Sequence, residues 1–270
     1  MIGDTDLSPP PRQPWSRREP SKRELRIISA LAVVAFLILW ELSARHRWIE
    51  PLFTSSPSRV FTAFRELVRT GELQRNGLAS LRLFLSGMSL AIGIGVPLGI
   101  VIGWYRRINA IIDPFISILY ATPRLALIPL ILLWFGVGDQ SRVVVVFLTA
   151  FFPIVINTTS GVRAIDPQLL RVSRVFGAND MQIFRTLALP TALPYIMTGI
   201  RLAIGQGLIG VVVAEFFLGK TGIGSMITRA GYTLRSDVAM VGVLIVAASS
   251  LILTAALRFI ERRLARWRPA

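Results

Sequence analysis

Few side chains in this 270-residue sequence are suited to catalysis or metal binding. The chain has no cysteine and one histidine, His46, which argues against thiolate catalysis, a cysteine-based metal site and a histidine triad or cluster. Gly219-Lys220-Thr221 matches the end of a phosphate-binding loop, but that motif requires a glycine where this chain has Ala214. We therefore expect no catalytic residue, no metal, no cofactor and no ATP hydrolysis in this chain.

The remaining candidates are polar or ionisable residues inside long apolar runs, where such groups usually face the protein interior or water. Arg124 lies between two prolines, so we expect a broken helix whose guanidinium lines a pathway and suits an oxyanion such as sulfonate or nitrate. The alternatives are a structural pair with Glu215 or a side chain that snorkels. Glu215 is itself a further candidate for the pathway. Asn157 and Thr158 either supply further pathway contacts or bond to backbone carbonyls of their own helix.

Six apolar runs must position these residues. The chain is 53% hydrophobic and 17% charged, against about 45–50% and about 25% in soluble proteins. A bilayer core requires about 20 helical residues per span. We predict an all-α polytopic membrane protein with six spans at Leu25–Ala44, Leu83–Tyr105, Pro114–Gly138, Val143–Val162, Pro194–Leu218 and Val238–Leu257. The first run also resembles a signal peptide, although no A-x-A cleavage site follows it.

The net charge of +15 lies between the spans instead of on one basic face, which argues against nucleic acid as a partner. Lys and Arg are more numerous on the side of the N-terminus, so we expect both termini in the cytoplasm. Residues 1–22 are predicted to form a disordered basic tail, and 261–270 a second basic tail. Residues 23–75 contain the first span and an outer amphipathic segment, which lies on the membrane surface or packs on the bundle. Residues 76–260 form the main transmembrane domain.

Small residues recur every fourth position at 91–103 in the second span and at 199–207 in the fifth. This spacing lets helix backbones approach closely, and it predicts two packing faces.

The segment between the fourth and fifth spans, 161–193, is longer than most helix connections. Asp166-Pro167 predicts a helix start, Gly177 its end, and Asn179 or Asp180 the cap of a second helix that Pro190 stops. Both helices have apolar faces, so we expect a helix–turn–helix in the cytoplasm. An exposed apolar face there requires a partner; the alternative is that the loop packs on its own bundle.

This segment resembles a known family. Gly177, followed after nine residues by Leu187 and then by Leu189-Pro190, is similar to the second half of the cytoplasmic "EAA" loop in permease subunits of type I binding-protein-dependent ABC importers. At the positions of the family's Glu-Ala-Ala, this chain has Arg171, Val172 and Ser173. The coupling residues that the resemblance implies are Arg171, Val172, Ser173, Gly177, Ala178, Leu187, Leu189 and Pro190. Residues 123–138, 199–203 and 215–224 resemble the aliphatic sulfonate, taurine and nitrate subgroup.

The resemblance implies a type I importer permease fold in the cytoplasmic (inner) membrane of a prokaryote. It further implies a homodimer of two permease copies surrounded by lipid, a cytosolic ABC ATPase dimer docked on the loop, and an extracytoplasmic substrate-binding protein. The alternative function is an ATPase-independent secondary transporter or channel, which the helix–turn–helix loop disfavours. A membrane-embedded enzyme is disfavoured because the spans contain no constellation for chemistry.

Overall fold

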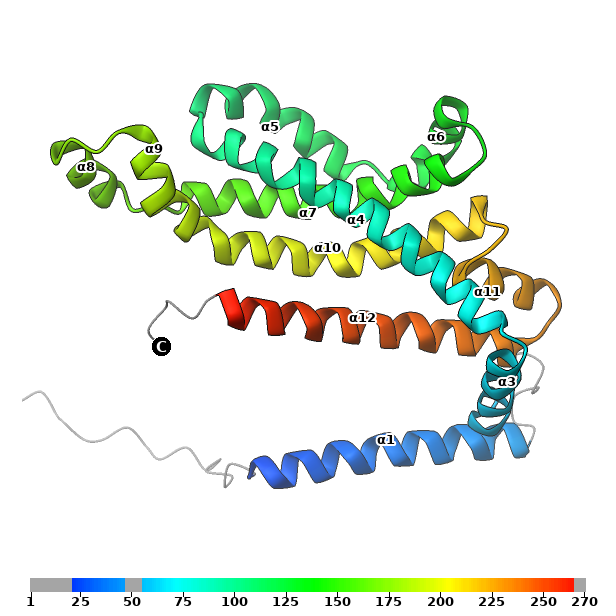
Figure 1. Cartoon of the computed structure of the whole chain (residues 1–270). Coiled ribbons are helices and arrows are strands. Elements are labelled where there is room, and N and C mark those ends of the chain that lie inside the picture. The colour runs from blue at the N-terminus through cyan, green and yellow to red at the C-terminus, as the bar shows by residue number, and fades with distance from the viewer. Residues whose placement is uncertain (1–20, 47–54, 265–270) are drawn as a thin grey trace, which may run out of the picture.

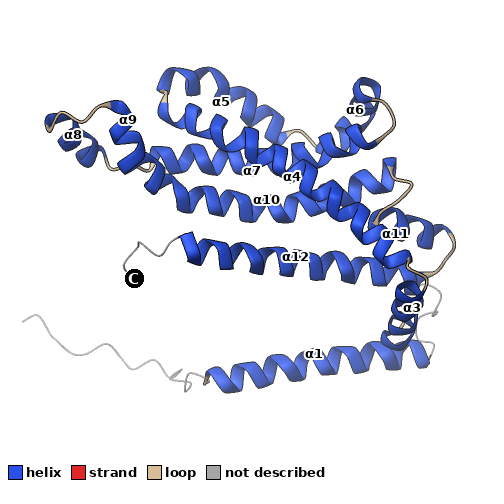
Figure 2. Ribbon diagram, in the orientation of Figure 1, coloured by secondary structure: helices blue, strands red, loops and turns tan. Residues whose placement is uncertain are grey.

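The computed structural model describes residues 21–46 and 55–264, and all regular structure within those ranges is helical (Figure 2). The elements in chain order are α1 (Lys22–Arg45), α3 (Pro57–Arg69), α4 (Glu72–Trp104), α5 (Arg106–Ala121), a 3-10 turn η1 (Arg124–Leu127), α6 (Ile128–Phe135), α7 (Asp139–Arg163), α8 (Pro167–Val175), α9 (Asp180–Ile183), a π-helical turn η2 (Phe184–Ala188), α10 (Leu189–Leu218), α11 (Ile223–Tyr232) and α12 (Ser236–Leu264).

Five described segments are long and apolar enough to cross a membrane: 23–45, 72–104, 139–163, 180–218 and 236–263. The predicted third span is a bent pair, α5 followed by η1 and α6, with an angle of 94° at the break. Counting this pair as one span gives the six predicted. The expected break at Arg124 is confirmed. Thr122 is extended because a residue before proline avoids the helical region, and Pro129 lies in the first turn of α6.

The centre of the molecule is α7, which lies between α4 and α10 (Figure 1). A Cβ added to Gly99 of α4 would lie 2.7 Å from the Thr158 Cβ of α7. On the other side, a Cβ added to Gly199 of α10 would lie 3.0 Å from the Pro153 carbonyl oxygen. Side chains would therefore force the helices apart at both contacts, and the two predicted small-residue packing faces are confirmed.

The prediction that the second loop helix ends at Pro190 is wrong. Helix continues without interruption from Asp180 through η2 and α10 to Leu218. A proline inside an α-helix removes one donor and crowds the carbonyl four residues earlier. The π-helical turn immediately before Pro190 shifts the bonding register there, which accommodates the proline inside a continuous helix.

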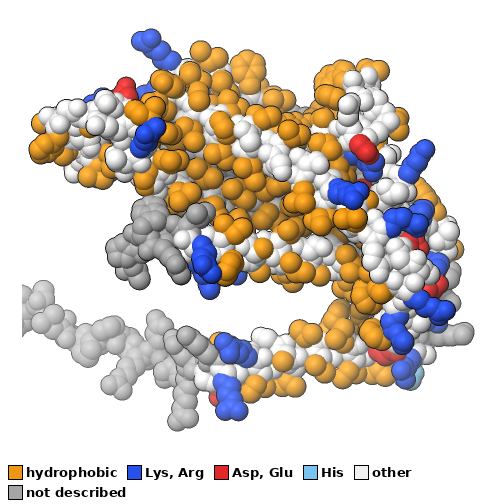
Figure 3. All heavy atoms as spheres, in the orientation of Figure 1, with side chains coloured by type: hydrophobic (Ala, Val, Ile, Leu, Met, Phe, Trp, Pro, Cys, Tyr) orange, Lys and Arg blue, Asp and Glu red, His pale blue; other side chains and the backbone are white. Residues whose placement is uncertain are grey.

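The first helix, α1, stands apart from the other spans. Only 6% of its apolar window is buried, and the space-filling view shows open space between α1 and α12 (Figure 3). The outer amphipathic segment, α3, buries Val60, Ala63 and Leu67 against α11 and α12, so the packing alternative holds for that face. Its neighbouring apolar side chains, Phe61 among them, remain exposed. Of the tails expected at 1–22 and 261–270, residues 1–20 and 265–270 lie outside the described residues. The remaining residues are ordered, because Ser21 caps α1, Lys22 begins it and α12 includes 261–264.

Gly99→Ala and Gly93→Ala should have opposite effects on stability. The methyl group of an alanine at position 99 would meet α7, so we expect overpacking to lower the free energy of unfolding by about 1–3 kcal/mol. A Cβ at Gly93 has no atom within 4 Å, so the higher helix propensity of alanine should stabilise that variant by up to about 1 kcal/mol. Thermal unfolding midpoints in one detergent provide the comparison, and equal midpoints for the two variants would contradict the packing described here.

Candidate coupling loop and membrane-embedded site

The loop helix α8 is fixed at its start by its sequence. Asp166 is extended and its carboxylate accepts a hydrogen bond of 2.7 Å from the Gln168 N–H, while Pro167 occupies the first turn. These are the residues that predicted the helix start, and the prediction is confirmed. At this end α8 therefore begins at a defined residue.

The turn after α8 is equally well defined. Gly177 has a φ of +77°, which a residue with a side chain rarely adopts. Its N–H donates to the Arg174 carbonyl, and the Ala178 N–H donates to the Ser173 carbonyl, each at 3.0 Å. These two bonds are the Schellman arrangement that closes a helix. Asn179 then exchanges bonds of 2.8 Å with Gln182 in a capping box that starts α9. The predicted helix–turn–helix is confirmed.

The second half of the loop is anchored in the bundle. Ile183 is buried, and Phe184 packs edge-on against Trp104 of α4 with ring centroids 5.7 Å apart. Leu187 and Pro190 are half-buried, and Leu189 begins α10. The alternative that the loop packs on its own bundle therefore holds for α9 and η2.

That alternative is wrong for α8. None of its residues is buried, and Val175 and Phe176 are 85% and 86% exposed. Val172 is also exposed, and Ser173 is half-buried. The helix lies at the end of the molecule opposite α3 and α11, with hydrophobic side chains at its surface (Figures 1 and 3). The structure thus presents a rigid, capped helix with an apolar surface that no other described part of the chain covers.

Arg124 occupies the break between α5 and α6. Its Nη1 donates a hydrogen bond of 3.2 Å to Oε1 of Gln206 on α10, and its guanidinium lies 5.3 Å from the centre of the Tyr120 ring. The expected alternative pair with Glu215 is wrong. Gln206 also lines an open groove of about 640 Å³ between α10 and α12, together with Arg201, Ser250 and apolar side chains. Arg124 is therefore a positive charge bonded to a residue that lines this groove, although Arg124 itself is not one of the lining residues.

Of the two candidates on α7, only Asn157 takes the other role considered for them, a bond to a backbone carbonyl of its own helix. The Asn157 amide donates to the Pro153 carbonyl of its own helix at 2.8 Å. Thr158 is fully buried where α7 meets Gly99 of α4, and its hydroxyl has no hydrogen-bond partner among the described residues. Neither residue lines the groove.

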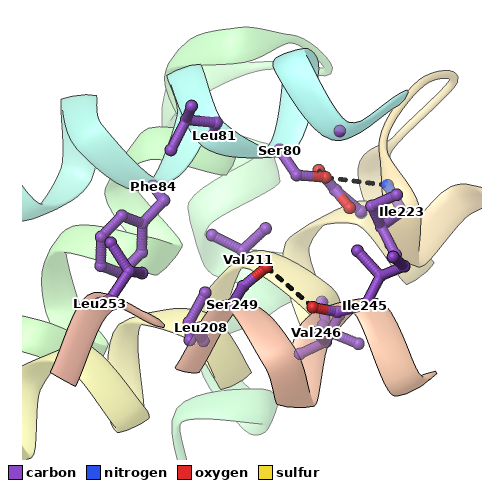
Figure 4. A pocket seen from close by; sticks show the side chains of 13 residues that line it. Ser80, Leu81, Phe84, Leu208, Val211, Ile223, Ile245, Val246, Ser249 and Leu253 are labelled. Carbon is purple, nitrogen blue, oxygen red and sulfur yellow. Dashed lines mark hydrogen bonds between the residues drawn. The ribbon is translucent and has the colours of Figure 1, made fainter. Parts of the chain in front are cut away.

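Glu215 of α10 is 1% exposed, and its carboxylate accepts hydrogen bonds from the two neighbouring helices α4 and α11. One carboxylate oxygen accepts from the Ser80 hydroxyl of α4 and the other from the Gly224 N–H of α11, each at 2.7 Å. Ser80 in turn accepts from the Ile223 N–H at 2.8 Å (Figure 4). Asn76 of α4 accepts from the Gly222 N–H. The carboxylate therefore caps the N-terminus of α11 and joins α4, α10 and α11.

A cavity of about 80 Å³ lies beside this carboxylate, lined mainly by apolar side chains such as Leu208, Val211 and Ile245 (Figure 4). The polar side-chain oxygens in its wall are already hydrogen-bonded, as in the Ser249 bond to the Ile245 carbonyl. The cavity therefore offers no free polar group to a solute. As expected, residues 215–218 are helical, so the P-loop-like segment beside them forms no phosphate loop.

Two features of this region were not predicted from the sequence. They are Gln206 as a partner of Arg124, and the ion pair between Arg201 and Glu261 that links α10 to α12. Their one sequence signal is the placement of polar residues in otherwise apolar segments.

Residues 95–266 match the family of binding-protein-dependent transport system inner membrane components. The putative aliphatic sulfonates transport permease protein SsuC of Bacillus subtilis is 32% identical over 253 residues, covering 93% of this chain and 92% of the relative. The taurine transport system permease protein TauC of Escherichia coli is 31% identical over 256 residues, again covering 93% and 92%. The bicarbonate transport system permease protein CmpB of Synechococcus elongatus is 35% identical over 214 residues, covering 74% and 76%.

Solved structures share the fold at lower sequence identity. An inward-facing structure of the MetNI methionine ABC transporter aligns with a TM-score of 0.58 and 21% identity, covering 73% of this chain and 96% of that one. An amino acid ABC transporter with histidines aligns with a TM-score of 0.59 and 19% identity, covering 74% and 97%. The fold is that of type I ABC importer permeases.

Glu215→Ala should destabilise the protein much more than Glu261→Ala. The first change leaves the half-buried Ser80 hydroxyl and the N-terminus of α11 without their acceptor, at a cost of about 3 kcal/mol. The second removes an ion pair whose side chains are about a third exposed, worth about 1 kcal/mol or less. Thermal unfolding in detergent distinguishes the two, and similar losses would show that Glu215 does not join the three helices as described.

Proposed function

This chain belongs to the family of binding-protein-dependent transport system inner membrane components and is a permease subunit of an ABC importer, not an enzyme, and we propose that it forms the substrate pathway and couples it to a cytosolic ATPase. The observation that carries the proposal is the uninterrupted helical segment Asp180–Leu218. It connects the exposed loop helix at one end of the molecule to the groove and to Glu215. A displacement of α8 would therefore reach the groove through a continuous helix.

The coupling residues are proposed to act in two groups. Arg171, Val172 and Ser173 belong to the exposed helix that meets the ATPase, while Gly177 and Ala178 form the closed turn behind it. Leu187, Leu189 and Pro190 lie where the loop enters α10, and they transmit movement into the span. Closure of an ATPase dimer on ATP would draw α8 with it and tilt α10, which alternates the groove between the two sides of the membrane.

We propose that two copies of the chain form the pathway, with both termini in the cytoplasm of a cell whose inner membrane contains the complex. Exposed apolar side chains on α1 and α5 supply surface for lipid and for the second copy. A substrate-binding protein would deliver solute at the opposite end, where α3 and α11 lie (Figure 1). An ATPase-independent transporter would leave the exposed surface of α8 without a role.

The proposed solute is a small oxyanion of the sulfonate, taurine or nitrate type. Relatives are named for aliphatic sulfonates, taurine and bicarbonate, which all contain an anionic oxygen group. Arg124 supports the assignment because a guanidinium presents paired donors to such a group. Gln206 and Tyr120 orient that guanidinium beside the groove.

Val175→Cys and Tyr232→Cys provide a matched test of the coupling surface. Each position is 85% exposed, one on α8 and the other at the opposite end in α11, and the chain has no other cysteine. We expect the cysteine at position 175 to be labelled only from the cytoplasm and to crosslink to the ATPase subunit of the transporter. The cysteine at position 232 should be labelled only from outside.

Labelling of both cysteines from one side would overturn the proposed orientation. Nucleotide-independent transport by the reconstituted permease alone would overturn the proposed coupling to an ATPase and would support the secondary-transporter alternative.

Arg124→Gln should raise the KM for taurine or ethanesulfonate uptake about 10–100-fold, because a hydrogen bond to a charged group contributes about 1.5–3 kcal/mol. Arg124→Lys keeps the positive charge but loses the paired donors of the guanidinium, so its KM should lie between those of the parent and Arg124→Gln. Uptake into proteoliposomes that contain the assembled transporter measures the effect. Unchanged KM values in both variants would remove Arg124 from the pathway.

A further inference from the structure

The exposed helix α8 carries two arginines, Arg171 and Arg174, besides its apolar residues. Both side chains are exposed, and neither makes a hydrogen bond or ion pair with any residue that the structure describes. Two adjacent like charges exposed to water repel each other only weakly, because water and salt screen them. In a docked helix it loses part of its hydration, and that loss must be compensated by opposite charge.

The arginines and the apolar residues occupy different sides of the helix. Successive residues of an α-helix are about 100° apart, so Arg171 and Arg174 lie next to each other on one side. Val172 and Phe176 lie together on another side for the same reason, and Val175 separates the two groups. The exposed surface of α8 is therefore divided lengthwise into a cationic strip and an apolar strip.

A third side of α8 is less exposed than the two strips. Leu170 and Ser173 are the half-buried residues of α8, and the Ser173 hydroxyl donates to the Leu169 carbonyl of the same helix. By helical spacing these two residues lie together on the side of α8 opposite Val175, between the apolar and the cationic strips. The capped start and the closed turn give the helix defined ends, and its geometry keeps the two strips in a fixed order around it.

Nearby acids do not neutralise the cationic strip. Asp166 is engaged at the N-terminus of α8, where it accepts the Gln168 N–H. Asp180 lies in the first turn of α9, across the turn from α8. Neither forms an ion pair with Arg171 or Arg174 among the described residues, whose ion pairs lie in other parts of the molecule.

We propose that the ATPase receives α8 in a groove with one apolar wall and one acidic wall, with carboxylates facing Arg171 and Arg174. This inference rests on the proposed function and adds the chemistry of the partner surface. The apolar strip supplies contact area, and the cationic strip fixes the direction and register of the helix. An ATPase with a basic or neutral wall at that place would be rejected, because it would face two unpaired cations.

The test compares charge reversals at two pairs of arginines in one cytoplasmic segment. Arg171→Glu with Arg174→Glu changes the strip on α8. Arg163→Glu with Arg185→Glu makes the same change in charge at exposed positions outside α8. Binding of the purified ATPase subunit to each permease is measured in phosphatidylcholine nanodiscs, between 50 and 500 mM NaCl. All four positions are exposed, so we expect unchanged unfolding midpoints.

The α8 pair should raise the Kd about 100-fold at low salt, because like charges across an interface cost several kcal/mol. The control pair should change the Kd less than about threefold, as expected for charges at the rim of an interface. The Kd of the parent should rise with NaCl. Lysine substitutions of the facing acidic residues on the ATPase should restore binding to the α8 variant.

Equal effects of the two pairs, or effects that appear only when phosphatidylglycerol is added, would overturn the inference and assign the arginines to lipid headgroups. Normal ATPase binding by the α8 pair would also overturn it while leaving the proposed function intact. Failure of the ATPase to bind the parent permease at any salt concentration would instead contradict the proposed function itself.

Discussion

The close contact of α4 and α10 with α7 is the constraint on which the rest of the molecule depends. Lipid tails are as apolar as leucine, so burial from water does not drive these helices together, and the stabilisation comes from packing at short range. At Gly99 and Gly199 a single methyl group would meet the neighbouring helix. Helices that lack such contacts, α1 above all, stand away from the centre. The small residues therefore determine which spans form the rigid part of the subunit.

Within this rigid part, α10 has three roles at once. Its middle packs on α7, its N-terminal end continues into the loop, and its C-terminal end places Glu215 under the N-terminus of α11. Because the carboxylate also binds Ser80 of α4, three elements are tied together at the end of the molecule opposite the loop. A movement applied at the loop would therefore act on a connected body and not on one isolated helix, which is what alternating access by rigid tilting requires.

The features that could be predicted from the sequence have local causes. The spans follow from runs of apolar residues, and the loop follows from Asp166, Gly177 and Asn179, each of which acts within four residues. The Gln206 partner of Arg124 and the Ser80 partner of Glu215 could not be predicted, because they lie 82 and 135 residues away in sequence. The predicted helix end at Pro190 was wrong for a different reason. A proline usually ends a helix, but the π-helical turn before Pro190 keeps this helix continuous. The groove beside Gln206 arises only when α10 and α12 are brought together.

An exposed apolar side chain contacts lipid on a membrane-spanning segment but water outside it, and this distinguishes two kinds of surface on the subunit. Exposed apolar residues on α1 and α5 lie on membrane-spanning segments, where lipid satisfies them without any partner protein. The helix α8 lies outside the spanning segments, where Val175 and Phe176 would face water. Burying two such side chains is favourable by about 1.5–3 kcal/mol each. Because α8 belongs to no spanning segment, this free energy is available to a docked protein, and the charge beside the two side chains then decides which protein.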